Sequence, residues 1–323
     1  AGALPTCRSD GRDATLRTGS WRQQKQIMTD VTPSAATSDD NANLAFLIVA
    51  HHQPYHLARL VRALDDQRSY FFIHVDRKAD LAPFRAAIPE KSNIIFLKDR
   101  LEVEWATLSV VQATLKLIDV AIAAEPAFRY FNLLSGSDYP IKSRRDIFAR
   151  LRSSNCQYMR VDRNVTNDPA DSHRHVVRDL PGGRHFGNLA PYHGSMYWSL
   201  TDDCVRYVCD FVKNNPGYLE IHRNVIAPDE VFFHTILKHS PFAAAITHDF
   251  SDGVYPDNTQ HANHFIDWTK PWPHMNLTLD ERNLDDLLAS SCLFARKFDE
   301  IKSRRLLDLL DERVHSFRAE RTA

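Results

Sequence analysis

The sequence lacks the features of several large protein classes. No apolar run approaches the roughly 20 residues of a membrane-spanning helix, and the longest, Leu44–Ala50, has the length of a strand. Five cysteines are scattered over 323 residues, a number typical of a reducing compartment rather than of a disulfide framework. The formal net charge is -1, without the basic excess of proteins that hold nucleic acid. These absences predict a soluble, cytoplasmic globular protein with no nucleic-acid partner.

Four short motifs of nucleotide and hydrolase chemistry are also missing. The chain contains neither GxGxxG after its first strand nor GxxxxGK[ST], and it has no GxSxG elbow. It also has no Asp-x-Asp pair, with which many sugar-nucleotide enzymes hold a divalent metal. A diphosphate bound here would therefore need Lys and Arg side chains to meet its charge.

Residues 1–40 differ from the rest of the chain in composition. They are rich in Ser, Thr, Asp, Arg and Gln and have almost no apolar periodicity, so burial cannot offset the entropy of ordering. The first residue is Ala1 and the first methionine is Met28, and the apolar segment of a secretory signal is absent. We expect either a disordered tail or a segment that is in part not native protein.

Strand-sized apolar runs alternate with helical periodicity over residues 41–323. This alternation indicates an α/β fold with a mostly parallel sheet over 41–323. The polar segment Asp162–Tyr192 is predicted to be a long loop or lid. The predicted strands are Leu44–Ala50, Tyr70–Val75, Asn93–Leu97, Tyr130–Leu134 and Gly194–Leu200. The predicted helices cover Leu57–Leu64, Leu108–Ala124, Asp202–Lys213, Pro228–Leu237 and Phe298–Phe317.

Candidate ligand-binding residues follow three of the predicted strands. Ligands of parallel sheets lie at the carboxyl ends of the strands, which puts His51, Asp76 and Ser135–Asp138 at one edge. A carboxylate at Asp76 can accept from a uracil N–H or from ribose hydroxyls. It can equally be a turn residue that ends a strand or caps the next helix.

Two further charged groups have both a functional and a structural interpretation. Pro228-Asp229-Glu230 opens an apolar helix, where acids are favoured by the helix dipole, but a carboxylate there can also act as a general base. Arg296 and Lys297 lie inside an apolar run, which is unusual for a solvated face, although long side chains can snorkel to water.

Sixteen histidines raise the question of a metal site. His173 and His175, and separately His261 and His264, have ligand-like spacing, but neither pair has the HExxH form. Neighbouring arginines crowd the first pair and would repel a cation. We therefore expect no bound metal and no other cofactor, with the Arg- and His-rich segment either solvated or covering an anionic donor.

Taken together, seven blocks in order resemble glycosyltransferase family 14, the core-2/I-branching N-acetylglucosaminyltransferases and the peptide O-xylosyltransferases. The resemblance runs from about Leu44 to Asp299 and implies a GT-A-type, Rossmann-like fold. It implies a single domain over 41–323, with a nucleotide-binding half over 41–150 and an acceptor half with the closing helix over 151–323. The blocks are Leu47–His52, Ile73–Lys78, Val103–Ser109, Asn132–Lys142, His193–Ser195, Pro228–Glu230 and Leu293–Asp299.

The resemblance implies an inverting, metal-independent transferase with a UDP-sugar donor and a glycan or other hydroxyl-bearing acceptor. Glu230 matches the catalytic base of the branching enzymes. Arg296 and Lys297 match the basic pair that neutralises the diphosphate. The positions expected to bind the donor are Ala50, His51, Asp76, Trp105, Arg296 and Lys297. Further candidates for donor or acceptor contacts are Ser137, Asp138, Gly194, Ser195, Asp229 and His274.

The chain departs from the family pattern at two positions. Met196 stands where the xylosyltransferases place a catalytic Asp, which favours Glu230 as the base, although Phe232–Thr235 resembles the xylosyltransferase wording. The stretch Pro271–Asn276 offers only His274 in place of a second phosphate-contacting Arg. Vertebrate members are disulfide-rich Golgi membrane proteins, and the given sequence shows neither many cysteines nor a long apolar run. We therefore expect a bacterial-type, cytoplasmic member. Peripheral association with the inner face of the membrane is left open.

The resemblance favours transfer of N-acetylglucosamine in a beta-1,6 linkage from its UDP donor. UDP-xylose is the alternative donor, which would make the chain an O-xylosyltransferase. From another class, a UDP-sugar-binding module without turnover is also open, and so is a metal-dependent hydrolase. The retained Glu230 argues against the module.

Overall fold

The computed structural model describes residues 42–164, 189–252, 260–267 and 278–319. The predicted tail over 1–40, most of the predicted loop and His274 lie outside these residues. The predicted division into two halves stays a prediction. No helix in the described ranges is long and apolar enough to cross a membrane.

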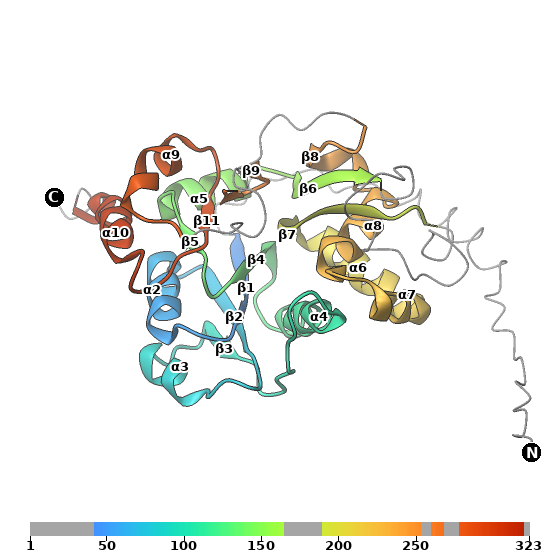
Figure 1. Ribbon diagram of the computed structural model, residues 1–323, viewed down its shortest axis with the longest axis horizontal. Helices are drawn as coiled ribbons and strands as arrows, with labels where there is room; N and C mark the ends of the chain where they lie inside the picture. Colours follow the sequence, from blue (N-terminus) through green and yellow to red (C-terminus); the bar gives the residue numbers. More distant parts are fainter. Residues whose placement is uncertain (1–41, 165–188, 253–259, 268–277, 320–323) are drawn as a thin grey trace, which may run out of the picture. The chain divides into compact units, whose positions relative to one another are not determined.

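A seven-stranded sheet with the order β3-β2-β1-β4-β7-β6-β8 forms the centre of the fold (Figure 1). Four neighbouring strands, β3, β2, β1 and β4, run parallel, whereas β7 is antiparallel to both β4 and β6. This confirms the predicted α/β class with a mostly parallel sheet. The strands are β1 (Asn43–Ala50), β2 (Ser69–Val75), β3 (Ile94–Phe96), β4 (Phe128–Ser135), β6 (Gln157–Asn164), β7 (Tyr192–Thr201) and β8 (Ile246–Asp249).

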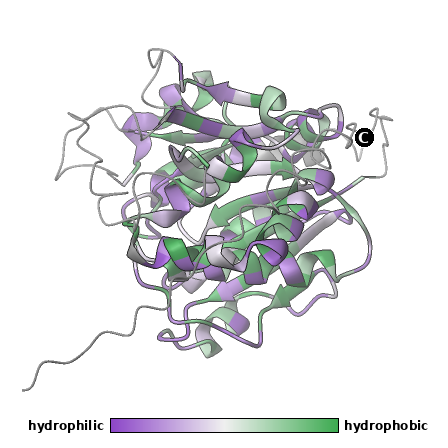
Figure 2. Cartoon of the chain, turned by 90° about the vertical axis from the view of Figure 1, so that its right-hand side faces the viewer, coloured by the Kyte–Doolittle hydropathy of each residue, from purple (hydrophilic) through white to green (hydrophobic). Residues whose placement is uncertain are grey.

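Strand β1 is buried on both faces, as its uninterrupted apolar sequence predicts. Alternate residues Leu44, Phe46 and Ile48 face a core cluster shared with α2, α5 and α10. Helix α4 contacts β1 and β2, and Figure 1 shows it on the other side of the sheet from α2. Figure 2 shows many residues of the central strands as hydrophobic. Burial on both faces therefore fixes the parallel strands whose ends position the site.

The helices agree with several predictions. Helix α2 starts at Pro54, where a missing N–H costs nothing, and α4 is capped by the Thr107 side chain, which accepts from Ser109 N. The helices are α2 (Pro54–Leu64), α3 (Ala82–Ala87), α4 (Leu108–Ile122), α5 (Arg144–Arg152), α6 (Asp202–Asn214), α7 (Pro216–Ile221), α8 (Phe232–Lys238), α9 (Leu284–Ala289) and α10 (Arg304–Ala319). The short 3-10 turns are η2 (His222–Asn224), η3 (Pro228–Glu230), η4 (Ala243–Ala245) and η5 (Glu281–Asn283).

A second sheet of four short strands was not predicted. Its order is β5-β11-β10-β9, with β10 and β11 parallel and the outer strands antiparallel. The strands are β5 (Tyr139–Pro140), β9 (Gln260–His261), β10 (His264–Ile266) and β11 (Phe294–Arg296). Strands of two or three residues show no period in the sequence, which is why the pattern missed them.

Two predicted helices have the wrong bounds. The predicted helix Pro228–Leu237 is broken, since η3 ends at Glu230 and α8 begins only at Phe232. The predicted helix from Phe298 begins instead at Arg304, because the Asp299 side chain accepts from Ile301 N and Lys302 N and holds that stretch in a turn. Both breaks leave charged residues on turns rather than along a helix.

Candidate active site

The carboxyl ends of β1, β2 and β4 meet at one edge, as predicted. Asp76 N donates to Ala50 O over 2.8 Å, and Gly136 N donates to Val49 O over 2.9 Å. A side chain at Gly136 would place its Cβ 2.8 Å from the Ala50 Cβ, so the close approach of this turn to β1 requires glycine. We call this region the strand-end edge.

Asp76 is buried at the strand-end edge and supports its local turn. Its Oδ1 accepts from Lys78 N at 2.9 Å, and its Oδ2 accepts from Val103 N at 3.3 Å. The Lys78 ammonium lies 3.6 Å from the same Oδ2. The segment that precedes Trp105 thus orients the carboxylate, and Asp76 acts as a turn residue at the end of β2. Its role in donor binding stays a prediction.

His51 and Lys297 come together although 246 positions separate them in the sequence (297 less 51). The ring of His51 stacks on His52 with centroids 4.1 Å apart. Burial lowers the pKa of both histidines, and the nearby charge of Lys297 lowers each further. Neutral imidazoles therefore face a cation at this edge.

Asp138 has no exposed surface and ties the first sheet to the second. Its Oδ1 accepts from the Ser135 hydroxyl at 2.6 Å and lies 3.3 Å from Arg296 Nε, and its Oδ2 lies 3.4 Å from His264 Nε2. Burial alone would raise the pKa of Asp138, but the bond from His264 and the charge of Arg296 outweigh it and lower that pKa. Asp138 thus remains a carboxylate that anchors Arg296.

Arg296 and Lys297 differ in what they contact. The Arg296 guanidinium carbon lies 4.7 Å from the centre of the Tyr197 ring, and with the Asp138 contact this fixes the side chain inward. Within the described part of the chain, the Lys297 ammonium has no hydrogen bond or ion pair. Burial and the charge of Arg296 lower the pKa of Lys297. Of the two predicted phosphate ligands, Lys297 is the cation available to an anion.

The acidic pair lies on η3, close to the basic pair. The charges of Arg296 and Asp229 act on each other: each favours the charged form of its partner. Burial, followed by the charge of Glu230, raises the pKa of Asp229 to about 7. Asp229 Oδ1 is buried and finds no hydrogen-bond partner among the described residues. Glu230, whose side chain is 29% exposed, lies 3.2 Å from His193 Nε2 through Oε2.

Gly194 and Ser195, together with Ser137, mainly serve packing. A Cβ on Gly194 would lie 1.9 Å from Arg160 O and 2.7 Å from the His234 ring, so β6 can cross here only above a glycine. Ser195 is buried, and its carbonyl accepts from His234 Nε2 at 2.9 Å. Ser137 is also buried, and its carbonyl accepts from Phe298 N at 2.9 Å.

Trp105 projects into solvent next to η3, with 87% of its surface exposed. Ala106 O accepts from Ala227 N at 3.0 Å, which joins the loop of Trp105 to the residue that starts η3. Both alanines have positive φ, at 60° and 51°, a conformation that non-glycine residues rarely adopt and that often occurs at functional sites. An exposed aromatic beside two carboxyls can stack on a base or a sugar ring.

His193 and Asp162 are site residues that sequence reasoning missed. In the His193–Ser195 block, the resemblance marks only Gly194 and Ser195 as candidate contacts. No motif spacing relates His193 to an aspartate on β6. The described residues contain no cluster of three or more His, Cys, Asp or Glu side chains that could hold a metal ion. The expected independence of metal stays a prediction.

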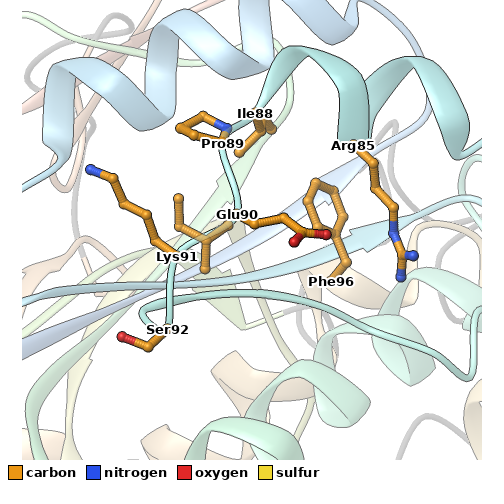
Figure 3. A pocket seen from close by; sticks show the side chains of 8 residues that line it. Arg85, Ile88, Pro89, Glu90, Lys91, Ser92 and Phe96 are labelled. Atoms are coloured by element: carbon orange, nitrogen blue, oxygen red, sulfur yellow. The ribbon is translucent and has the colours of Figure 1, made fainter.

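A surface hollow of about 470 Å³ lies away from these residues, between α3 and β3 (Figure 3). Its lining includes Arg85, Glu90 and Lys91 as well as Phe96. None of the candidate donor or catalytic residues contributes to it. The proposed site is therefore defined by its charged groups and not by this hollow.

The family model and the curated relatives point to the same family. A family model described as Core-2/I-Branching enzyme matches residues 44–288. Over 318 residues the chain is 24% identical to a Bos taurus beta-1,3-galactosyl-O-glycosyl-glycoprotein beta-1,6-N-acetylglucosaminyltransferase, covering 88% of this chain and 72% of that protein. It is also 24% identical over 296 residues to Xylosyltransferase 2 of Mus musculus, covering 83% of this chain and 33% of that protein. A crystal structure of the galactosyltransferase LgtC with donor and acceptor sugar analogues covers 84% of this chain and 95% of that one, at 10% identity and a TM-score of 0.43.

The chain belongs to the Core-2/I-branching enzyme family, glycosyltransferase family 14, and it is a glycosyltransferase. Family membership and the observed sheet confirm the predicted family and the predicted GT-A-type α/β fold. The matched residues end before Arg296 and Lys297, so the role of the basic pair depends on the geometry described above.

Proposed function

We propose that this glycosyltransferase transfers N-acetylglucosamine from UDP-N-acetylglucosamine to a hydroxyl of a glycan acceptor, with inversion and without a metal. Glu230 is the general base, and Lys297 meets the charge of the diphosphate. The observation that carries the proposal is a partly exposed carboxylate, Glu230, next to Asp229, whose carboxyl feels the charge of Arg296, the neighbour of the unpaired cation Lys297 in the described part of the chain.

The arrangement supports a single displacement. The acceptor oxygen forms a bond to C1 of the sugar while the bond from C1 to the phosphate oxygen breaks, and UDP leaves with the electron pair. Glu230 takes the acceptor proton. Lys297 stabilises the charge that develops on UDP, and Arg296 strengthens the local positive field from its fixed position.

Asp229 is the rival base. A pKa of about 7 suits a general base near neutral pH, but burial against Arg296 makes its oxygens less accessible than those of Glu230. Two adjacent carboxyls that differ in burial are a common arrangement for acid and base roles. We therefore assign the base to Glu230 and keep Asp229 as the alternative.

UDP-xylose is the second candidate donor. The chain is as similar to a xylosyltransferase as to a branching enzyme, at 24% identity to each. Met196, however, leaves the position of the xylosyltransferase aspartate without a carboxylate. A screen of UDP-sugars that measures UDP release, with and without a panel of glycans, decides between the donors.

The base is tested with Glu230→Gln, which keeps the shape of the side chain but cannot accept a proton near neutral pH. We expect UDP binding by calorimetry to persist while transfer falls by at least about 100-fold. Asp229→Asn is the matched control on the neighbouring residue. An inactive Asp229→Asn beside an active Glu230→Gln would move the base by one residue and overturn the assignment.

A further inference from the structure

Two carboxylates from different elements flank the imidazole ring of His193. Nε2 lies 3.2 Å from Glu230 Oε2 on η3, and Nδ1 lies 3.5 Å from Asp162 Oδ2 on β6. Only 8% of the His193 side chain is exposed. A carboxylate oxygen lies near each ring nitrogen, and two flanking negative charges favour the imidazolium form over the neutral ring.

The charged groups packed around His193 favour that form. Burial alone would lower the pKa of His193, but hydrogen bonds to Asp162 and then Glu230 outweigh it and raise the pKa to about 9. On β6, Arg160 Nε donates to Asp162 Oδ1 at 2.6 Å and holds that carboxylate in place. Asp229 on η3 and His234 on α8 also face the ring, and burial lowers the pKa of His234 to about 4, so it adds no competing charge near neutral pH.

The local backbone brings these groups together. The pairing of β6 with β7 shifts register on both sides of Val161, and such bulges re-aim side chains. Gly194 lets the Arg160 carbonyl cross β7 closely, next to His193. The irregular pairing of β6 and β7 therefore accompanies the placement of Asp162 beside the His193 ring.

We propose that His193 is a positioning residue for Glu230. With Asp162 on its other side, its ring donates to Glu230 Oε2, orients that carboxylate and leaves Oε1 to accept the acceptor proton. The inference rests on the proposed role of Glu230 as the base.

Asp229, the neighbouring carboxyl, gives a reason for a cation in contact with Glu230. Two adjacent carboxyls repel as anions, so they compete for one proton near neutral pH. The His193 cation contacts Glu230 directly and only faces Asp229, which directs the proton to Asp229. Without the cation, no positive charge in contact with Glu230 favours the anionic form that the base requires.

The test is His193→Gln, whose amide still donates a hydrogen bond to Glu230 but carries no charge. UDP release is measured against pH with UDP-N-acetylglucosamine and water as the acceptor, or with UDP-xylose if only that donor turns over. We expect the acidic limb of the kcat/KM profile to move up by about one pH unit or more, because an opposite charge at this distance lowers a carboxyl pKa by about that amount. The donor KM and the rate at high pH stay near those of the wild-type enzyme.

His222→Gln is the matched control. His222 is a buried histidine whose Nδ1 lies 2.8 Å from the Tyr218 carbonyl, and burial lowers its pKa to about 4. This variant is expected to lower the melting temperature without moving the acidic limb. An equal shift in both variants, or no shift in His193→Gln, would overturn the inference. The pH profile of His193→Gln is measured again in an Asp229→Asn background. Glu230 is then the only carboxyl of the adjacent pair, so a remaining shift cannot come from Asp229.

Histidine nitrogen NMR on the wild-type full chain provides a readout independent of turnover. We expect the His193 ring to stay protonated at pH 8 and to titrate at least about one unit lower in Glu230→Gln. A neutral His193 at pH 7 would refute the inference even if His193→Gln failed to fold. If Glu230→Gln retains transfer, the proposed function fails; if it is inactive while His193→Gln behaves as wild type, only the role of His193 fails.

Discussion

Adjacent cations with different surroundings should respond differently to removal. Lys297→Ala deletes an ammonium that has no described ion pair, whereas Arg296→Ala deletes the partner of the fully buried Asp138. The first change should affect ligand binding and the second mainly folding. Lys302→Ala, an exposed lysine nearby, is the control for loss of a positive charge alone.

The magnitude for Lys297 follows from its expected contact with the diphosphate. A hydrogen bond between charged groups contributes about 1.5–3 kcal/mol, so UDP should bind roughly 10- to 100-fold more weakly. Because the ammonium has no ion pair in the described residues, the free energy of unfolding should change by about 0.5 kcal/mol or less.

For Arg296 the balance is reversed. Removing one partner of a buried ion pair costs about 3–5 kcal/mol, and Asp138 would keep only its bonds to Ser135 and His264. In a domain of this size each kcal/mol shifts the melting temperature by about 2–4 °C, so a fall of roughly 6 °C or more is expected. UDP binding, measured below that temperature, should weaken less than in Lys297→Ala.

Calorimetric titration with UDP measures ligand binding, and thermal denaturation measures the stability of both variants. The reasoning is refuted if Lys297→Ala binds UDP as wild type does. It is also refuted if Arg296→Ala melts as wild type does while Lys297→Ala unfolds.

Three further predictions concern the metal, the tail and a glycine. UDP-sugar turnover should survive excess EDTA, and a loss that only Mn²⁺ restores would contradict metal independence. Deleting residues 1–40 should leave the melting temperature and turnover nearly unchanged, since that composition buries little surface; a large drop in either would show a structural role. Gly194→Ala should lower the free energy of unfolding by about 1–3 kcal/mol or more, because its Cβ would meet Arg160 O at 1.9 Å, and a denaturation curve like that of the wild type would contradict this.

Residues near in sequence were the predictable part of this site. The strand-end edge follows from apolar runs that end in polar residues, since parallel strands bring their carboxyl ends together wherever the helices lie. The break after Glu230 was not predictable in the same way. It depends on Ala227, whose left-handed backbone bonds to the loop of Trp105, and that contact belongs to the fold.

The charge state and the contacts of the site residues depend on long-range electrostatics. The sequence by itself determined the fold class, the family and the residue types of the site, because periodicity and motif order are local properties of the chain. Only the tertiary structure separated Arg296 from Lys297 by placing Asp138 and Tyr197 against the first, and only it set His193 between Asp162 and Glu230. The physical reason is that burial and a charge a few ångströms away fix the protonation of a side chain, and both depend on residues brought together from distant parts of the sequence.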